Sequence, residues 1–331
     1  MTGILVLGGG SIGKRHMGNI LSLGVPPAQV FAVEPRADRQ AEVVAKGVLR
    51  ENIFSSRDEA LAAGGFDRAV VATPTSMHYD DAIALARQGV SVCIEKPLAA
   101  DLSRIDELFA SVRERGVYAM VAYCFRFDEM CRTFKRLLDD GAIGRPLYTR
   151  AEMSTYLPAW HPWEDYRTFY MAQKRLGGGT LLDQSHLFDM ARFFFGDVAG
   201  LAGVSLKCSD LEIDTDDFGE FYLEMKSGMR LSMHIDLFTQ PDREFFQVTG
   251  TKGTLEWVLN KRVIRLLTPE KEEVVCKDIP YDRMYVTEMQ HFLAEADKGP
   301  HTAWPSLDDA RAAMDVVEAI RISGMRSFVT L

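Results

Sequence analysis

Three side chains that can exchange or hold protons are spaced three residues apart in the segment LGGGTLLDQSHLFD, residues 176–189. Asp183 and Asp189 each lie three positions from His186. In a helix, about 100° per residue places the two carboxylates about 60° to either side of the imidazole. A neighbouring carboxylate favours the imidazolium form and orients the ring, so the spacing predicts a general base. The alternative is structural, with Asp183 capping a helix and His186 buried and hydrogen-bonded.

Three glycines near the start of the chain form a second pattern, GGGSIG, in which Gly8, Gly10 and Gly13 fit GxGxxG. The pattern follows an apolar run and opens a predicted helix, whose N-terminal N–H groups can hold a pyrophosphate. Glu34 comes 21 residues after Gly13 and ends the next apolar run. An acid there can hydrogen-bond the adenosine ribose and favours NAD over NADP, although Arg36 softens that preference. The alternative is a tight turn without a ligand.

Two further segments follow apolar runs, ATPTSMH at 72–78 and EKP at 95–97. Open α/β sheets bind ligands at the carboxyl ends of their strands, which is where both segments are expected. For His78 the alternative is a residue at a helix start with no ligand. The predicted cofactor contacts are Gly8, Gly10, Ser11, Ile12, Gly13, Glu34, Arg36, Thr73, Pro74, His78, Glu95 and Lys96.

The elements that must position these residues alternate in the first part of the chain. Strand-like runs are followed by helix-like stretches, which predicts a doubly wound parallel sheet, a Rossmann fold, with helices on both faces. We assign residues 1–122 to this NAD(P)-binding domain. The predicted strands are 4–8, 30–34, 68–73, 90–96 and 117–122, and the helices include 16–23 and 79–88.

After Tyr123 the pattern changes to an alternation of apolar and polar residues, at 147–155 and again at 201–274. Ser227-Gly228 and Lys252-Gly253 mark two hairpin turns within this region. We therefore expect residues 123–331 to form an α+β domain with a largely antiparallel open sheet. Two predicted helices, 285–297 and 306–322, end the chain.

Composition restricts the class of protein. The chain has 331 residues, 47% of them hydrophobic, and a formal net charge of −9, which argues against nucleic acid as a partner. Its five cysteines are scattered without CxxC spacing, so neither a disulfide framework nor a metal site is predicted. The start has no secretory pattern and no apolar run reaches the roughly 20 residues of a membrane span, so we expect a cytoplasmic protein.

The order GGGSIG, ATPTSMH, EKP and GGGTLLDQSHLFD resembles the glucose–fructose oxidoreductase/inositol dehydrogenase (Gfo/Idh/MocA) family over essentially the whole chain. The resemblance implies a catalytic lysine at Lys96, between nicotinamide and substrate, a catalytic acid at Asp183 and a catalytic histidine at His186. It also implies that the domain of residues 123–331 binds substrate and mediates oligomerisation. The histidine follows the acid by three residues, with Ser185 before it, where inositol dehydrogenases usually have four. This DxSH form is similar to a subgroup linked to polysaccharide and unusual-sugar pathways.

The segment STYLPAWHPWEDYRTFYMAQKR, residues 154–175, is rich in aromatic and basic side chains and runs into the glycine turn. Aromatic faces pack on sugar C–H surfaces and basic groups pair with anions, so we expect the segment to contact substrate. The alternatives are a self-packed loop or an oligomer contact. For Arg126, at the family's domain crossover, a structural ion pair is an equal alternative. The predicted substrate contacts are Tyr156, His161, Trp163, Tyr166, Arg167 and Arg126, with Lys174 and Arg175 behind them.

Together these patterns predict an NAD(P)-dependent sugar dehydrogenase or reductase that moves a hydride between nicotinamide and a hydroxyl or ketone carbon. Its substrate is a sugar or sugar derivative, with nucleotide-linked and acidic sugars among the possibilities. One alternative is an enzyme that oxidises transiently with retained NAD to cleave a glycosidic bond or epimerise. Another is an NAD-binding regulator without catalysis. We expect a homodimer or homotetramer that does not bind membranes.

Overall fold

The computed structural model describes residues 2–298 and 305–324, which divide into two compact units. Unit 1 comprises the described residues up to Cys124 and the described part of Asp282–Arg311. Unit 2 comprises Phe125–Tyr281 and the described residues from Ala312 onward. The division at 122/123 remains a prediction about domains, but the contacts group the segment that begins at Asp282 with unit 1.

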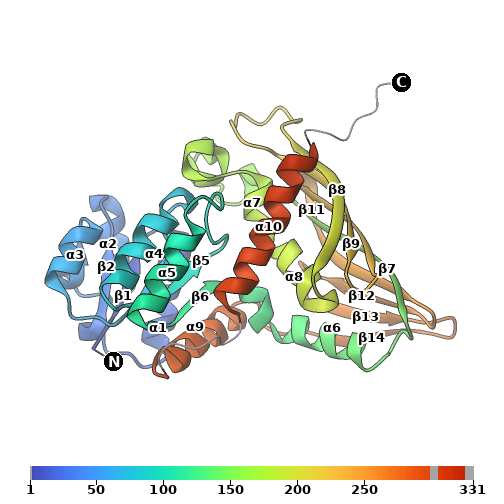
Figure 1. Cartoon of the computed structure of the whole chain (residues 1–331), viewed down its shortest axis with the longest axis horizontal. Coiled ribbons are helices and arrows are strands. Elements are labelled where there is room, and N and C mark those ends of the chain that lie inside the picture. The colour runs from blue at the N-terminus through green and yellow to red at the C-terminus, as the bar shows by residue number, and fades with distance from the viewer. Residues whose placement is uncertain (1, 299–304, 325–331) are drawn as a thin grey trace. The chain divides into compact units, whose positions relative to one another are not determined.

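Unit 1 is built on a six-stranded parallel sheet in the order β3-β2-β1-β4-β5-β6, the strand order of dinucleotide-binding folds (Figure 1). The Rossmann fold expected from the alternating pattern is confirmed. Strand β3 was not predicted, because two residues are too short to show a periodicity. The strands are β1 (Ile4–Leu7), β2 (Val30–Val33), β3 (Ile53–Phe54), β4 (Arg68–Val71), β5 (Ser91–Glu95) and β6 (Ala119–Ala122).

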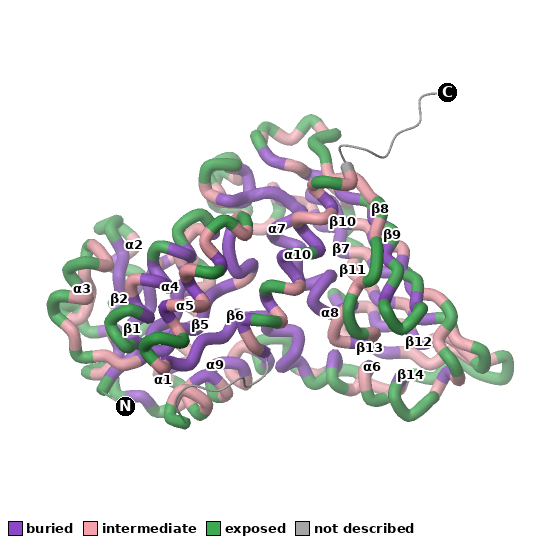
Figure 2. The backbone as a smooth tube through the Cα atoms, in the orientation of Figure 1, coloured by how far each residue is buried: buried purple, intermediate pink, exposed green. Residues whose placement is uncertain are grey.

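Helices cover this sheet, and α4 packs beside α5 while α1 packs beside α9. The α-helices are α1 (Ser11–Ser22), α2 (Ala37–Ala45), α3 (Arg57–Ala63), α4 (His78–Arg87), α5 (Ile105–Arg115) and α9 (Arg283–Ala296). Short 3-10 turns are η1 (Pro27–Gln29), η2 (Arg50–Asn52) and η3 (Thr75–Met77). Strands β1, β4 and β5 are buried along their whole length, because helices lie on both faces. Figure 2 draws buried backbone in purple.

Unit 2 contains an eight-stranded sheet in the order β14-β13-β12-β11-β7-β10-β9-β8. All pairings are antiparallel except that of β10 with β7, which confirms the largely antiparallel sheet. Both predicted hairpins are present, as β9–β10 and β11–β12. The strands are β7 (Pro146–Tyr156), β8 (Val198–Leu206), β9 (Phe218–Met225), β10 (Arg230–Asp236), β11 (Phe238–Gly250), β12 (Thr254–Val258), β13 (Val263–Leu267) and β14 (Glu272–Lys277).

One face of this second sheet is covered. On β9, Phe221 and Leu223 are buried while Glu220 and Tyr222 on the opposite face are exposed, the pattern of a half-covered sheet. Helix α8 packs on β7, α6 on β12–β14 and α7 on β9 and β10. The α-helices that contribute to unit 2 are α6 (Glu129–Asp139), α7 (Thr180–Asp183), α8 (Ser185–Phe195) and α10 (Leu307–Gly324), which begins among residues grouped with unit 1.

The short turns that involve unit 2 are η4 (Cys124–Phe127), η5 (Leu157–Ala159), η6 (Tyr166–Thr168), η7 (Tyr170–Ala172) and η8 (Lys174–Leu176). Four of them lie in the aromatic segment, which is therefore a loop of single turns. Among residues 2–298 and 305–324, no helix combines the length and apolar character that crossing a membrane requires.

Candidate active site

The glycine turn between β1 and α1 has the shape of an anion cradle. Gly8 has φ +100°, and a Cβ on Gly13 would collide with the carbonyl oxygen of Gly8, so both positions need glycine. The nearest described atom to a Cβ on Gly10 is Arg39 Nη1, 3.9 Å away, so this side of the turn is open. Helix α1 begins directly after Gly10, and its N–H groups face the same end. This turn fits a dinucleotide pyrophosphate.

Glu34 directly follows β2 and lies next to this turn, and its side chain accepts hydrogen bonds from backbone N–H groups. Its Oε2 accepts a hydrogen bond from Gly9 N–H at 2.8 Å, and its Oε1 accepts one from Arg36 N–H at 2.9 Å. Arg36 in turn binds Asp38, with 2.6 Å between Nη2 and Oδ2, and this pair lowers the pKa of Asp38. The charge of Arg36 is therefore offset locally, which supports the predicted preference for NAD.

His78, a predicted cofactor contact, is only 1% exposed and joins two backbone segments. Its Nε2 lies 2.9 Å from the carbonyl oxygen of Thr73, and its Nδ1 lies 3.0 Å from that of Pro97. Burial lowers the pKa of His78, and a neutral imidazole can donate to only one of the two carbonyls. His78 thus links the turn after β4 to the turn after β5, and its own contact with a cofactor remains a prediction.

Glu95 supports the backbone that carries Lys96. Its Oε1 lies 2.5 Å from Nε2 of the fully buried His16, and its Oε2 accepts Lys96 N–H at 3.2 Å. Glu288 of α9 is also fully buried. Its burial is the main cause that raises its pKa well above the usual value, and the nearby negative charge of Glu95 raises it further. The sequence analysis did not select His16 or Glu288. Each is a polar residue within a predicted helix, and no other feature of the sequence marks it.

In unit 2, the glycine turn before Asp183 is capped from a remote segment. Leu181 N–H donates to Asp216 Oδ2 at 2.7 Å, and Thr180 N–H donates to the Asp216 carbonyl at 3.0 Å. Gly179 has φ +109°, and a Cβ there would collide with the Asp216 carboxylate. Asp216 therefore fixes the start of α7, and no local pattern predicted this contact, because Asp216 lies far along the chain.

The expectation of one continuous helix through Asp183, His186 and Asp189 is wrong. Asp183 ends the single turn α7, and Gln184, with φ −85° and ψ 19°, departs from helical geometry before α8 begins. His186 and Asp189 share α8. The expected offset of about 60° around a helix axis therefore applies to His186 and Asp189. The position of Asp183 depends instead on the turn at Gln184.

Asp189 and Arg126 form a buried, bidentate ion pair. The distances are 2.7 Å from Nε to Oδ2 and 2.6 Å from Nη2 to Oδ1, and the two side chains are 1–2% exposed. These contacts favour the ion-pair alternative for Arg126, and its substrate contact stays a prediction. His186 is 8% exposed, and its ring meets the Phe125 ring edge-on with 5.0 Å between centroids.

Tyr170 is a contact of the predicted acid that sequence reasoning did not select. Its hydroxyl donates to Asp183 Oδ1 at 2.7 Å. It lies in the aromatic segment, so a signal was present, but the choice among that segment's tyrosines required the fold. The structure thus places one predicted substrate loop in direct contact with one predicted catalytic residue.

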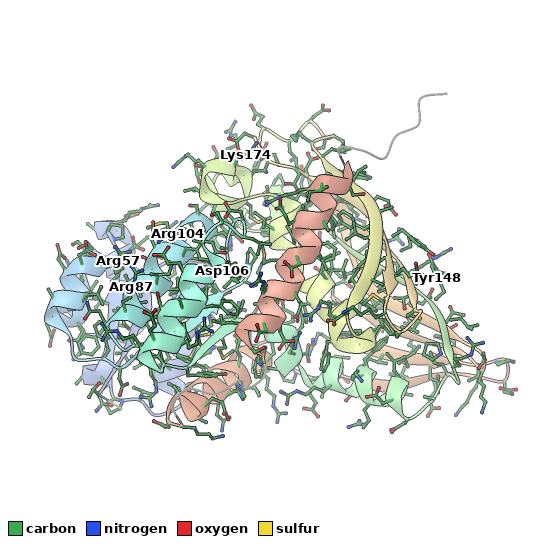
Figure 3. All side chains as sticks on the ribbon, viewed as in Figure 1. Arg57, Arg87, Arg104, Asp106, Tyr148 and Lys174 are labelled. Carbon is green, nitrogen blue, oxygen red and sulfur yellow. The ribbon has the colours of Figure 1, made fainter. Side chains whose placement is uncertain are left out.

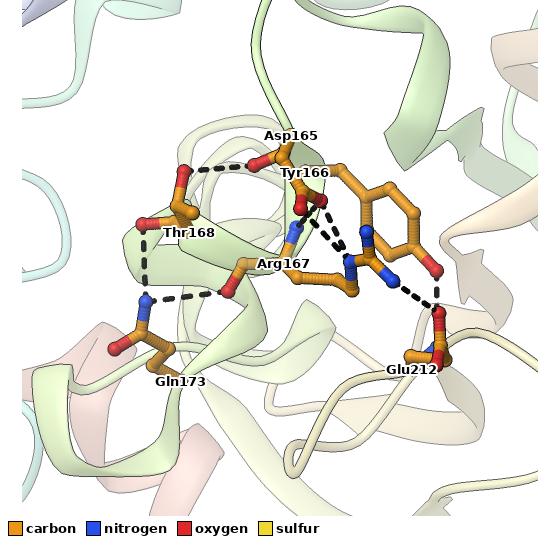
Figure 4. A network of polar contacts seen from close by, with 6 residues as sticks. All are labelled: Asp165, Tyr166, Arg167, Thr168, Gln173 and Glu212. Atoms are coloured by element: carbon orange, nitrogen blue, oxygen red, sulfur yellow. Dashed lines mark hydrogen bonds and ion pairs between the residues drawn. The ribbon is translucent and has the colours of Figure 1, made fainter.

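The polar residues of the aromatic segment are tied to one another (Figure 4). Arg167 binds Asp165 through Nε at 2.8 Å and Glu212 through Nη1 at 2.8 Å, and Glu212 N–H donates to the Tyr166 hydroxyl at 3.2 Å. Gln173 donates to the carbonyls of residues 167 and 168. Arg167 is half exposed, so these ion pairs are weak in water.

The aromatic residues of the segment also contact each other. Leu157, Met171 and Leu237 form a small core against which Tyr166 and Tyr170 pack. His161 contacts the rings of Trp163 and Phe169, each with 5.3 Å between centroids, while Trp163 is 76% exposed. Tyr156 ends β7, with its N–H bound to Asp242. These contacts support the self-packed alternative for the segment, and the substrate contacts remain predictions.

No three His, Cys, Asp or Glu side chains gather as a metal site within the part of the chain that the structure describes. The described site residues are therefore a dinucleotide cradle with Lys96 in unit 1 and an acid, a histidine and an aromatic loop in unit 2.

Two family models match the chain. Residues 2–123 match "Oxidoreductase family, NAD-binding Rossmann fold", and residues 131–256 match "GFO/IDH/MocA C-terminal domain". The chain is 32% identical to scyllo-inositol 2-dehydrogenase (NAD(+)) of Bacillus subtilis (strain 168), over 98% of the chain and 93% of that relative. It is 27% identical to inositol 2-dehydrogenase of Rhizobium meliloti (strain 1021), over 95% of the chain and 94% of that relative.

Solved structures share the fold. Levoglucosan dehydrogenase in complex with NADH and levoglucosan superposes with a TM-score of 0.84 at 21% identity, covering 98% of this chain and 97% of that one. GenD2 from gentamicin A biosynthesis in complex with NAD gives 0.81 at 22% identity, over 98% and 95% of the two chains.

Proposed function

Because the chain belongs to the Gfo/Idh/MocA family of NAD-binding oxidoreductases, we propose that Lys96, Asp183 and His186 carry out hydride transfer on a sugar or polyol. Two observations carry this proposal: an open dinucleotide cradle in unit 1 and, in unit 2, a buried acid and a buried histidine on neighbouring helices. Both relatives named above are inositol dehydrogenases, and the name of the first specifies NAD(+), which supports a polyol or sugar substrate here.

The glycine turn and Glu34 are the residues that would hold NAD. The pyrophosphate would lie on the open side of Gly10, and the fixed Glu34 carboxylate would accept hydrogen bonds from the adenosine ribose. When bound, NAD accepts the hydride that leaves the carbon undergoing oxidation. Thr73 and Pro74, after β4, complete the proposed contacts from the next strand end.

His186 acts as the general base in the oxidation direction. It takes the proton of the substrate hydroxyl, so that the C–O bond becomes a carbonyl as the hydride leaves the carbon. The Lys96 ammonium stabilises the negative charge that develops on that oxygen. Asp183 orients the imidazole and stabilises its protonated form. In reduction the same groups return the proton.

Substrate binding is assigned to the aromatic segment. Trp163 offers an exposed aromatic face, and the His161 ring lies beside it. Tyr156, at the end of β7, contributes its ring and hydroxyl. Tyr166 and Arg167 contribute to substrate binding through the hydrogen bonds that hold the loop. Arg126 contributes through its ion pair with Asp189 of α8.

The proposal is tested by mixing the purified protein with NAD and a panel of sugars while recording nicotinamide absorbance. The panel contains free polyols, uronic and sialic acids and nucleotide sugars, and each corresponding ketose is tested with NADH. We expect net turnover with one class. His186→Ala is expected to lower kcat by about 10²–10⁴-fold while the Kd for NAD, measured calorimetrically, stays unchanged.

Two results would contradict this assignment. Unchanged turnover in His186→Ala would remove His186 from the chemistry. Confirmed NAD binding without net change in absorbance for any compound would point to an enzyme that recycles its nicotinamide, which product analysis by mass spectrometry would reveal.

We further propose a cytoplasmic homo-oligomer, a dimer or tetramer, that binds neither nucleic acid nor membrane. The net charge of −9 and the described helices, none of which suits a membrane, support this. So does the uncovered face of the unit 2 sheet, where Glu220, Tyr222 and Glu224 are exposed and another surface can cover them. Light scattering on the purified protein measures the assembly mass.

A further inference from the structure

The end of the aromatic segment is fastened to the glycine turn that precedes Asp183. Gly179 N–H donates to the Met171 carbonyl at 3.0 Å, and Gly178 N–H donates to the Gln173 carbonyl at 3.2 Å. Thr215 Oγ1 donates to the same Met171 carbonyl at 3.0 Å. A Cβ on Gly178 would collide with the Tyr170 carbonyl, so only glycine at this position lets the glycine turn lie so close to the end of the aromatic segment. The position of Tyr170 is therefore fixed relative to α7.

The side chain of Tyr170 continues this connection. Its ring packs on the core of Leu157, Met171 and Leu237, and its hydroxyl donates to Asp183 Oδ1 at 2.7 Å. Asp183 is 6% exposed, so this hydrogen bond lies largely out of water. A hydrogen bond to a buried carboxylate is both stronger and more directional than one at the surface.

The two acids on either side of His186 in sequence are held differently. Asp189, on α8, gives both carboxylate oxygens to the Arg126 guanidinium from η4, which offsets its charge. Asp183, on α7, accepts from a neutral hydroxyl. A hydrogen bond from the Tyr170 hydroxyl draws on the negative charge of the Asp183 carboxylate, so its strength affects the charge that Asp183 presents to its surroundings.

We propose that Tyr170 is a positioning residue of the active site, which fixes the Asp183 carboxylate and moderates the charge that Asp183 presents to His186. This inference rests on the proposed function of Asp183 and His186. It also makes the aromatic loop part of the catalytic apparatus, because any substrate that shifts η7 shifts the hydroxyl that Asp183 accepts from.

The test is Tyr170→Phe, which keeps the ring in its core and removes the hydroxyl. Without that donor, Asp183 presents more negative charge and its orientation loosens. We expect kcat for alcohol oxidation to fall about tenfold, the Kd for NAD to stay unchanged, and the acidic limb of the pH–rate profile to move to higher pH, since the imidazolium of His186 is favoured. Loss of folding would lower activity without moving that limb.

Tyr148→Phe is the matched control. Tyr148, labelled in Figure 3, lies on β7 and contacts Arg150, with 5.9 Å from the guanidinium carbon to the ring centroid. It has no part in the proposed site, so its variant is expected to keep the wild-type profile.

A double-mutant cycle with Asp183→Ala separates this role from others. If Tyr170 acts through Asp183, then Tyr170→Phe has no further effect on the residual turnover of Asp183→Ala. Equal effects in both backgrounds, or a change in KM with an unmoved acidic limb, would overturn the proposal and make Tyr170 a substrate contact.

The cycle also works if the wild-type protein oxidises none of the compounds tested. Thermal unfolding of the wild type, the two single variants and the double variant then measures the coupling between Tyr170 and Asp183 as a difference in stability. Coupling without turnover would leave the hydroxyl–carboxylate contact in place and reject the proposed function. Additive losses of stability would reject the contact itself.

Discussion

At the scale of single residues, the predicted site gains its precision from partners that lie elsewhere in the chain. His186 and Lys96 were recognisable from their surroundings in sequence. The partners of the neighbouring residues could not be recognised in the same way. His16 binds Glu95, Tyr170 binds Asp183, and Arg126 binds Asp189. Each of these partners is at least half-buried, so a change in any of them is expected to act on stability as well as on rate.

The Arg126–Asp189 pair gives a quantitative expectation for stability. Asp189→Leu leaves the buried guanidinium without its counter-charge and is expected to lower the free energy of unfolding by about 3–5 kcal/mol. The double variant Arg126→Met with Asp189→Leu replaces both charges and is expected to recover most of that loss. Urea unfolding of the two variants and the wild type measures this.

The same variants decide whether Arg126 is a structural ion-pair partner or a substrate contact. Recovery of turnover together with stability in the double variant would make Arg126 structural. Recovered stability without turnover would favour a substrate contact. A loss below about 1 kcal/mol in Asp189→Leu would contradict the ion pair as described.

At the scale of elements, three connections fix the site residues: the turns after β1 and β5 and the cap of α7. Strand β1 is buried on both faces and delivers the glycine turn at its carboxyl end. Strand β5 delivers Glu95 and Lys96, and His78 from the start of α4 links their segment to the turn after β4. Asp216 caps α7 in the same way that an N-cap side chain would, although it comes from another segment.

Two glycines of the first turn are expected to separate cofactor binding from folding. Gly10→Ala places a methyl group in open space, so the melting temperature without NAD should stay unchanged while the Kd for NAD rises about tenfold or more. Gly13→Ala forces a methyl group against the Gly8 carbonyl, so it should lower the melting temperature. Calorimetric titration with NAD and thermal unfolding without it measure the two effects.

A lower melting temperature in Gly10→Ala, with NAD affinity retained, would show that the open side of Gly10 faces something other than the cofactor. In that case the pyrophosphate assignment of the turn would be wrong.

At the scale of the whole molecule, burial and hydrogen bonds shift the pKa values of several groups in unit 2. Burial, with Asp242 nearby, raises the pKa of Glu244 on β11 to about 7. His234 on β10 lies between Asp236 and Glu220, 2.9 and 2.8 Å from their oxygens, and the hydrogen bond with Asp236 raises its pKa. Asp217 and Asp236 have lowered pKa values, because their hydrogen bonds outweigh burial, so their contributions are lost only in acid.

These shifts predict that stability falls as pH rises through neutrality. Glu244 binds its proton more tightly in the folded state, so the free energy of unfolding should decline between about pH 4.5 and 7. His234 contributes its stabilisation fully below its unfolded pKa of about 6.5 and loses it as pH rises through the higher folded value. Urea unfolding at a series of pH values measures the slope.

Glu244→Gln is expected to flatten this decline, since the amide does not titrate. Glu224→Gln, at an exposed position on β9, controls for the change of carboxylate to amide and should leave the slope as it is. A slope that stays steep in Glu244→Gln would assign the decline to other groups.

The sequence by itself determined the architecture and the chemical types of the site. Alternating strand and helix runs predicted the parallel sheet of unit 1, and period-two runs with glycine turns predicted the antiparallel hairpins of unit 2. These features are local, because each periodicity and each glycine constraint is set by the residues next to it. GxGxxG and Glu34 were predicted from such local patterns, whereas the roles predicted for Lys96 and His186 rest on the order of motifs that resembles the family.

Only the tertiary structure decided which partner each site residue has. It broke the expected helix at Gln184, paired Asp189 with Arg126, set Tyr170 on Asp183 and brought Asp216 to cap α7. Each of these contacts joins residues from separate elements, and packing of whole elements brings them together. A hydrogen bond to a buried carboxylate depends on distance and direction in space, which neighbours along the chain do not specify.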